Sequence, residues 1–234
     1  MAVQGAIPLA GVQGAAPPGL ASLTLPHPPL LVISDRRQAP GRDLARVAEA
    51  AFAAGGRWFS VREKDLAPSD RLALLARVVA VGRGHGACVM IHGDVSAARA
   101  VGAGGVHLPA GGDVRAARAV LGAGVVIGVS AHSAAEVRAA AGADYVTVSP
   151  VFLSESKPGY GPALGLAGVR ALAGLGVPVL ALGGVDVARV GGCLAAGAVG
   201  VAVMGGVMRA ADMGGVVRGL LAGLGGAAPA GSPN

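Results

Sequence analysis

The stretch GVHLPAGGDVRAARAVLGAGVVIGVSAHSAAEVRAAAGADYVTVSP, residues 105–150, decides the fold class. Three short apolar runs, 105–108, 125–131 and 145–150, alternate in it with longer segments that mix alanine with charged residues. Short valine-rich runs bounded by glycine or proline are typical of strands that are buried on both faces. Strands that alternate with helical segments indicate β-α-β units, in which neighbouring strands are parallel. The stretch therefore predicts an α/β fold.

The same alternation extends over most of the 234 residues. Apolar runs that predict strands occupy 30–35, 57–63, 87–92, 105–108, 125–131, 145–150, 177–184 and 200–206. This alternation over about 200 residues predicts a single-domain (β/α)8 TIM barrel, with a doubly wound open sheet as the alternative. We expect the barrel to occupy 28–224, between disordered tails rich in Ala, Gly and Pro at 1–27 and 225–234.

Helix signals support this division of the chain. A helix is expected over 69–81, capped by Ser69, and another over 133–141, where Ser133 and Glu136 fit a capping box. The residues expected on the buried face of the first helix are Leu72, Leu75, Ala76 and Val79. Glycine supplies the left-handed conformation that ends a helix. It follows alanine before predicted strands in four segments, 53–56, 101–105, 141–144 and 195–198.

Composition argues against several classes of partner. Hydrophobic residues make up 53% of the chain and charged residues 14%, so a large core is easy to build. The net charge of +6 comes from arginines and two lysines that are spread singly, with Arg36-Arg37 as the densest cluster. A nucleic-acid surface needs a concentrated basic patch with aromatic residues. We therefore expect a small anionic ligand and no nucleic-acid partner.

The chain is also expected to be cytoplasmic. Each long apolar run is interrupted by Gly, Pro or charge, and the first basic residue is Arg36, so neither a membrane span nor a signal peptide is expected. Cys88 and Cys193 lie in apolar surroundings without metal-ligand spacing. They are expected to be buried, reduced thiols with no functional role.

Polar residues and glycine pairs follow the predicted strands, and the active sites of such barrels lie at the carboxyl ends of the strands. Candidate binding residues there are Arg62, Lys64, His92, Ser130, Ser154, Ser156 and Lys157. Gly183-Gly184 follows the seventh strand, and Met204, Gly205 and Gly206 follow the eighth. Many barrels bind phosphate at these two places through main-chain N–H groups, although glycines in tight turns are the alternative. His107 is expected to be packed inside the barrel.

Seven motifs carry a resemblance to a known family: LVISDR, VREKD, VGAGGVHLP, GVSAHS, SPVFLSESKPGYGPALGL, PVLALGGV and GVAVMGG. Taken in this order, the chain resembles the thiamine phosphate synthase/TenI family across 28–222. The resemblance implies a barrel, and a role in making the thiazole half of thiamin or in joining its two halves.

The two activities of this family need different sites. By the resemblance, the synthase condenses a pyrimidine pyrophosphate with a thiazole phosphate and uses Mg²⁺, held by one Asp after the third strand and another after the fourth. Here those positions read His92-Gly93 and 109–112 (PAGG), while Asp94 and Asp113 each stand one residue late. The TenI branch is similar to this chain at both places. It includes a thiazole tautomerase, which implies a general acid and base after the fifth strand, at His132.

We therefore predict an isomerase, a metal-free thiazole tautomerase that needs no cofactor. His132 would shuttle the proton. Gly184, Gly205 and Gly206 would bind the phosphate, and Arg62 and Lys64 would orient the ligand, unless they form a salt-bridge network with Glu63 and Asp65. His132 could instead be a structural residue at a helix start.

The other functional readings stay open. A synthase that needs Mg²⁺, with Asp94 and Asp113 as a displaced ligand pair, is one alternative. A non-catalytic phosphate-binding relative is another. The expected partner is a small phosphorylated thiazole, homo-oligomers are possible, and 153–161 suits a hinged lid.

Overall fold

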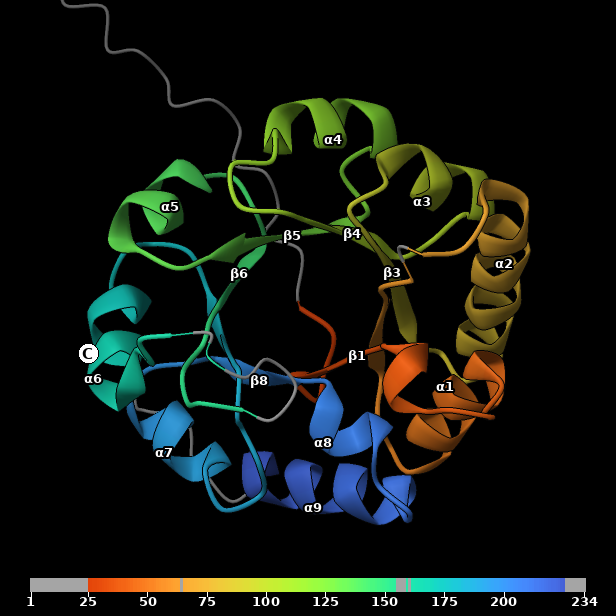
Figure 1. Cartoon of the computed structure of the whole chain (residues 1–234). Coiled ribbons are helices and arrows are strands. Elements are labelled where there is room, and N and C mark those ends of the chain that lie inside the picture. The colour runs from red at the N-terminus through yellow and green to blue at the C-terminus, as the bar shows by residue number, and fades with distance from the viewer. Residues whose placement is uncertain (1–24, 64, 155–158, 160, 226–234) are drawn as a thin grey trace, which may run out of the picture.

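The computed structural model describes residues 25–63, 65–154, 159 and 161–225. Eight parallel strands close into a barrel in sequence order, and β8 pairs with β1 (Figure 1). The strands are β1 (Leu30–Ile33), β2 (Trp58–Val61), β3 (Cys88–His92), β4 (Gly105–Leu108), β5 (Val126–Ala131), β6 (Tyr145–Val148), β7 (Val179–Leu182) and β8 (Gly200–Val203). The predicted TIM barrel is confirmed, and the doubly wound sheet is excluded.

Several predicted strands extend too far at their carboxyl ends. The run 177–184 contains β7, but Gly183 and Gly184 have φ angles of +98° and +62° and leave the extended conformation. Gly205 and Gly206 do not continue β8 either, because they begin the short helix α8 (Gly205–Met208). The residues that overshoot belong to the loops above the strands, where polar side chains collect.

Large and small residues alternate inside the barrel. Trp58, Met90 and Tyr145 fill its interior and are fully buried. Gly128 makes room for Tyr145, since a Cβ there would lie 2.1 Å from the Tyr145 ring. Gly105 does the same for Met90, whose Cε would be 2.7 Å away. Pairing of this kind keeps the interior close-packed without strain.

Helices surround the barrel (Figure 1). They are α1 (Leu44–Ala53), α2 (Pro68–Gly84), α3 (Val95–Val101), α4 (Val114–Leu121), α5 (Ala134–Ala139), α6 (Gly165–Ala173), α7 (Val190–Ala195), α8, α9 (Met213–Gly225) and the 3-10 helix η1 (Arg36–Gln38). Glycines at the predicted punctuation sites have positive φ, as at Gly102 (+59°) and Gly197 (+100°). The expected helix endings are therefore confirmed.

The start of α2 was predicted wrongly. Pro68 occupies its first turn, the capping position is Ala67, and no side chain caps the helix, so Ser69 is not the cap. Leu72 and Ala76 are exposed, and the buried face carries Leu75, Val78, Val79 and Gly82. Leu75 and Val79 are thus buried as predicted, whereas Val78 and Gly82 take the places expected for Leu72 and Ala76.

The start of α5 follows the capping-box prediction more closely. Ser133 Oγ accepts a hydrogen bond from the main-chain N–H of Glu136 at 3.3 Å. The Glu136 carboxylate reaches back to the N–H of His132, at 2.6 Å, instead of to that of Ser133. The Glu136 side chain, in the first turn of α5, therefore also holds the main chain of His132, the residue before the cap Ser133.

The predicted disordered tails lie almost wholly outside the described residues. Leu25, within the expected tail, packs against the barrel interior. Among the helices of the described residues, none has the length and apolar character needed to cross a membrane. Cys193 is buried as expected, whereas Cys88 is half-buried. Burial raises the pKa of the Cys88 thiol to about 12, so this sulfur is a poor nucleophile.

Candidate active site

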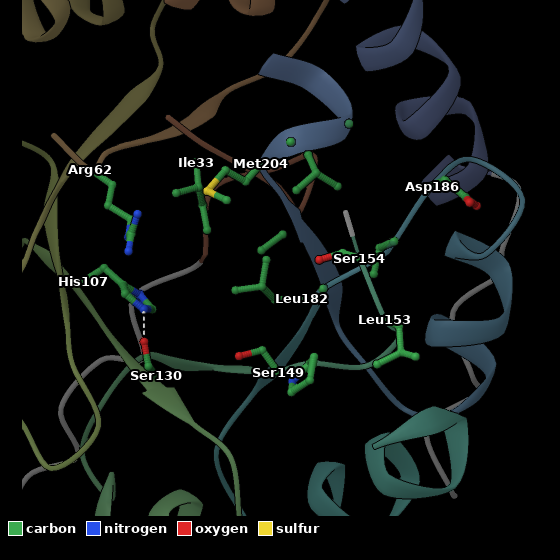
Figure 2. A pocket seen from close by; sticks show the side chains of 18 of the residues that line it. Ile33, Arg62, His107, Ser130, Ser149, Leu153, Ser154, Leu182, Asp186 and Met204 are labelled. Carbon is green, nitrogen blue, oxygen red and sulfur yellow. Dashed lines mark hydrogen bonds between the residues drawn. The ribbon is translucent and has the colours of Figure 1, made fainter. Parts of the chain in front are cut away.

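A cavity of about 550 Å³ opens at the carboxyl ends of the strands (Figure 2). Its lining includes these residues predicted from the sequence: Arg62, His92, Ser130, His132, Ser154, Gly184, Met204, Gly205 and Gly206. In Figure 2, Arg62 and Ser130 lie on one side of it and Ser154 on the other. Lys64, Ser156, Lys157 and most of the predicted lid lie outside the described residues, so their roles stay predictions. A volume of this size suits a small ligand.

His132 lies directly after β5 and is held at both its main chain and its ring. Its N–H donates to Glu136, as described above, and its Nδ1 lies 2.7 Å from the carbonyl oxygen of Ser149. A carbonyl oxygen only accepts hydrogen bonds, so Nδ1 carries the proton and the lone pair of the neutral ring is on Nε2. The position and tautomer of His132 suit a group that accepts a proton from a ligand in the cavity.

The two glycine pairs behave differently. A Cβ on Gly183 would lie 2.9 Å from Pro150 Cα, and one on Gly184 would lie 2.6 Å from the carbonyl oxygen of Leu153. The turn after β7 therefore needs glycine to pack beneath the loop that follows β6. A Cβ on Gly206 would meet nothing within 4 Å. Packing explains the first pair, whereas the bare main chain at Gly206 is open to the cavity.

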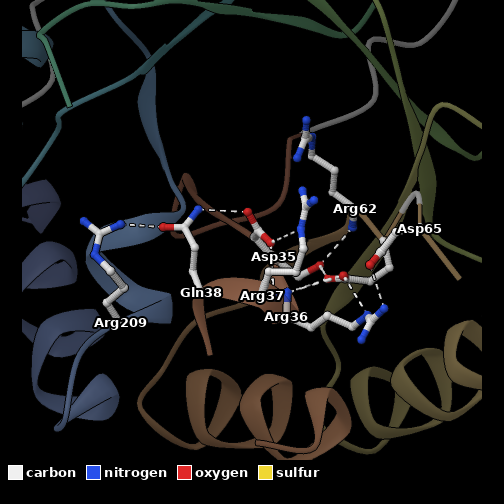
Figure 3. A network of polar contacts seen from close by, with 9 residues as sticks. Asp35, Arg36, Arg37, Gln38, Arg62, Asp65 and Arg209 are labelled. Atoms are coloured by element: carbon white, nitrogen blue, oxygen red, sulfur yellow. Dashed lines mark hydrogen bonds and ion pairs between the residues drawn. The ribbon is translucent and has the colours of Figure 1, made fainter. Parts of the chain in front are cut away.

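Arg62 faces the cavity above a network of polar contacts (Figure 3). Its N–H donates to Ser34 Oγ at 2.9 Å, and Ser34 in turn donates to Glu63 at 2.7 Å. Arg36 pairs with both Glu63 and Asp65, at 3.7 and 2.7 Å. Within the described ranges the Arg62 guanidinium has no carboxylate partner. The salt-bridge network expected around Arg62 thus forms around Arg36, and Arg62 remains available to an anion.

Burial affects the pKa of Glu63 in this network. Desolvation raises the pKa of Glu63 above its usual value, although hydrogen bonds from Ser34 and from the Arg36 N–H oppose the rise. The carboxylate is almost fully buried, yet each of its contacts is with a donor. Glu63 thus fixes the backbone that carries Arg62.

The floor of the cavity is formed by His107, which is 1% exposed. Its Nδ1 lies 2.9 Å from Tyr145 Oη, and its Nε2 lies 2.9 Å from Ser130 Oγ. The ring also packs on His92, with the centroids 4.9 Å apart. Desolvation lowers the pKa of His107 to about 4, so the ring is neutral near pH 7. His107 is packed inside the barrel as predicted, and it also contacts the cavity.

Three charged residues of the cavity lining were missed by sequence reasoning: Asp186, Arg189 and Arg209. Arg189 donates to the carbonyl oxygen of Gly184 at 2.5 Å and lies over the Phe152 ring at 4.8 Å. Arg209 hydrogen-bonds Gln38. Each arginine follows a glycine pair by a few residues, which is the signal that could have found it. Arg189 also pairs with Asp186 at 3.6 Å, so the three residues together leave the wall near Gly184 and Gly206 with a net positive charge.

Asp94 and Asp113 cap helices outside the lining of this cavity. Asp94 caps α3, accepting from the Ala97 N–H at 2.8 Å, and pairs with Arg71 at 2.8 Å. The bond from Ala97 is the main cause that lowers the pKa of Asp94, and Arg71 adds to it. Asp113 caps α4 through the Ala116 N–H at 2.9 Å. Neither carboxylate lines the cavity.

Comparison with known proteins places this site in a family. The sequence matches the family described as thiamine monophosphate synthase (TMP-TENI) over residues 30–207. The chain belongs to this family. A relative from Geobacter sulfurreducens is 41% identical over 174 residues, and the match covers 72% of this chain and 81% of the length of the relative. The thiamine-phosphate synthase of Methanoculleus marisnigri is 37% identical over 173 residues, covering 72% and 82%.

A solved structure agrees with this assignment. The thiamine phosphate pyrophosphorylase of Pyrococcus furiosus superposes with a TM-score of 0.74 at 26% identity, covering 84% of this chain and 95% of that one. The family supports an enzyme of thiamin biosynthesis. The names of the relatives are those of synthases, so they favour a transferase over the isomerase expected from the sequence.

The magnesium site that the resemblance implies for the synthases does not fit the residues present. The two places expected to hold carboxylates carry Gly93 and the segment 109–112, and the neighbouring Asp94 and Asp113 are engaged as helix caps. In the described part of the chain, no three His, Cys, Asp or Glu side chains gather as a metal site. A displaced pair made of Asp94 and Asp113 is therefore not supported by their positions.

Proposed function

We propose that this protein isomerises a thiazole phosphate carboxylate by proton transfer, without a metal ion or an organic cofactor. The observation that carries the proposal is the pairing of His132 with the cavity: its Nδ1 is fixed by Ser149, which leaves the basic lone pair on Nε2. Asp94 and Asp113, the displaced pair considered for Mg²⁺, cap helices and are absent from the cavity lining. Proton transfer needs one positioned acid and base and no leaving group.

The proposed reaction is balanced within the substrate. Nε2 of His132 takes a proton from a ring carbon, and the electron pair that is released shifts through the ring toward the exocyclic double bond. The imidazolium then returns the proton to the exocyclic carbon, which gives the aromatic isomer. The hydrogen bond from Nδ1–H to the Ser149 carbonyl can persist in both the neutral ring and the imidazolium, so the ring stays in place between these two steps.

Binding is assigned to the charged and glycine-rich walls. The phosphate lies against Gly205 and the open main chain of Gly206, beside Arg209. The substrate carboxylate faces Arg62, whose guanidinium is directed at the cavity (Figure 2). A planar guanidinium suits a carboxylate because it can donate two parallel hydrogen bonds.

His132→Asn tests the catalytic assignment. The Asn amide can still donate to the Ser149 carbonyl, but it has no base at the place of Nε2. We expect kcat to fall by roughly 10² to 10⁴, while the affinity for the aromatic product, measured by titration calorimetry, is unchanged. An unchanged kcat would refute the assignment. Product binding by a wild-type protein without any turnover would favour the non-catalytic relative.

The synthase is the second candidate, and the names of the relatives favour it. The two candidates separate in one assay, in which the wild-type protein is given the pyrimidine pyrophosphate and the thiazole phosphate with Mg²⁺. Formation of thiamin phosphate that EDTA abolishes would establish the synthase. Isomerisation that persists in EDTA, with no thiamin phosphate formed, would establish the proposed reaction.

A further inference from the structure

The floor of the cavity holds a chain of polar side chains that the proposed reaction does not use. His107, on β4, connects Tyr145 on one side of its ring with Ser130 on the other. Thr147 Oγ1 also lies 3.4 Å from His107 Nε2. Figure 2 shows Ser130 at the cavity, joined to His107 by a hydrogen bond. These hydrogen bonds thus connect the buried hydroxyl of Tyr145, through His107, to the hydroxyl of Ser130, which lines the cavity.

The contacts of this chain select one tautomer of His107. Ser130 Oγ, 2.9 Å from Nε2, can donate to that nitrogen only if it carries no proton; its single lone pair then accepts from Ser130, since Thr147 Oγ1 is more distant at 3.4 Å. Tyr145 Oη also lies 3.4 Å from Met90 Sδ, an acceptor to which it can donate. If Nδ1 of His107 donates to Tyr145 Oη and Nε2 accepts from Ser130, Tyr145 keeps its proton for Met90, whose sulfur also accepts from Trp58 Nε1 at 2.8 Å. The opposite tautomer would leave Tyr145 without a proton for Met90.

In this arrangement Ser130 donates its proton to His107 and turns its oxygen lone pairs toward the cavity. A serine beside a histidine that is oriented by a third group resembles an activated nucleophile. Activation requires the histidine to accept the serine proton and become a cation. Burial lowers the pKa of His107 to about 4 and so opposes that cation. The contact therefore fixes Ser130 and does not activate it.

We propose that His107 is a positioning residue that holds Ser130 as a hydrogen-bond acceptor facing the cavity, and that this acceptor sets the orientation of the ligand. An oxygen fixed as an acceptor repels phosphate and carboxylate groups, which are themselves acceptors. The uncharged ring face of the ligand then lies against Ser130, while its phosphate lies against Gly205, Gly206 and Arg209. The identity of this ligand rests on the proposed function, whereas the state of His107 does not.

The first test examines the ligand-free wild-type protein. With ¹⁵N-labelled histidine, nuclear magnetic resonance distinguishes protonated from unprotonated ring nitrogens. We expect Nδ1 of His107 to carry the proton and Nε2 to carry none, with no second protonation until the pH falls to about 4. A proton on Nε2 at neutral pH would overturn the proposal, whatever reaction the enzyme catalyses.

The second test asks whether His107 acts through Ser130. Ser130→Ala and His107→Leu should each lower kcat and KM of the isomerisation together, by up to roughly tenfold, because a ligand that is no longer repelled at this place also binds in unproductive orientations. The kcat of the double variant should be no lower than that of the slower single variant. Losses that multiply would show that the two residues act independently and would overturn the proposal.

Matched variants separate positioning from simple packing. Thr147→Val removes a hydroxyl beside His107 from a residue outside the cavity lining, and it should change kcat by less than about twofold. His107→Gln keeps an acceptor for Ser130 and should restore most of the kcat that His107→Leu loses. If Gln behaves like Leu, or if Thr147→Val matches His107→Leu, the role is structural. A wild-type protein that does not bind the product would contradict the proposed function and leave the tautomer test standing.

Discussion

The glycines around the cavity and inside the barrel differ in what surrounds them, although the sequence presents them alike. Gly128 supports the fold, because Tyr145 occupies the space of its absent Cβ. Gly183 and Gly184 combine positive φ with backbone contact, so they too are structural. Gly206 has neither a positive φ nor a backbone atom close to the position of a Cβ. We propose that its lack of a side chain gives a ligand access to the main chain.

Gly206→Ala tests this distinction. We expect the stability of the protein to be unchanged or raised, by up to about 1 kcal/mol, because alanine is the better residue in a helix. The affinity for thiazole phosphate should fall by about tenfold or more, roughly 1.4 kcal/mol, because the methyl group keeps the phosphate from the main chain. Gly124→Ala, also in open space but away from the cavity, is the control and should bind normally. Equal affinities of both variants would exclude this phosphate site.

Asp94 and Asp113 can be tested in the same way. Replacing either by Ala removes a helix cap and should destabilise the protein by about 1 kcal/mol in urea unfolding, with kcat nearly unchanged. The pKa of Asp94 is lowered in the folded protein, so its carboxylate stabilises the fold at neutral pH, and this contribution is lost as the pH falls through the folded pKa. The stability difference between wild type and Asp94→Ala should therefore shrink in acid. A large loss of kcat in either variant would instead point to a metal ligand.

At the scale of elements, the loop from β5 into α5 positions His132 through two side chains of one helix terminus. Ser133 caps the helix, and Glu136 holds the N–H of His132. The ring of His132 is held separately by the Ser149 carbonyl, so the main-chain contact and the ring contact together fix the position of Nε2. A group that moves protons benefits from such support, since small displacements slow transfer.

Glu136→Ala should therefore reduce kcat by more than the accompanying loss of folding stability explains. We expect about 0.5 to 2 kcal/mol of destabilisation from the damaged helix start, and several-fold lower kcat with unchanged product affinity. Glu136→Gln keeps an oxygen for the His132 N–H and should restore most of the activity. If Ala and Gln variants have the same kcat, the capping contact has no part in placing His132.

The sequence predicted most elements, because the periodicity of burial is local information. It failed where tertiary packing decides. The exposed Leu72 resembles a core residue in the sequence, and only the position of α2 on the barrel shows that Leu75 and Val78 are the buried ones. Arg189 and Arg209 were missed because their place at one cavity follows from barrel closure, and the local signal, the glycine pair that precedes each of them, was not used.

At the scale of the whole molecule, the barrel interior changes from apolar to polar along its axis. Trp58 and Met90 belong to the apolar part, and His107 and Ser130 lie at the floor of the cavity. His107 is therefore surrounded by protein, and the titratable groups that face it are His92 and Tyr145. A neutral ring satisfies its contacts there, whereas a cation would lose its hydration.

Because His107 is buried, the stability of the folded protein depends on pH. The pKa of His107 is about 4 in the folded protein, against an ordinary value near 6.5, so the unfolded chain binds the proton more tightly and stability falls as the pH drops between these values. Two and a half pKa units correspond to roughly 3 kcal/mol. Urea unfolding of wild type and of His107→Gln, compared at several pH values, isolates this contribution. The wild type should lose roughly 3 kcal/mol more than the variant between neutral pH and about pH 4. Parallel losses would mean that water reaches the ring and that the barrel is less closed around His107 than its packing indicates.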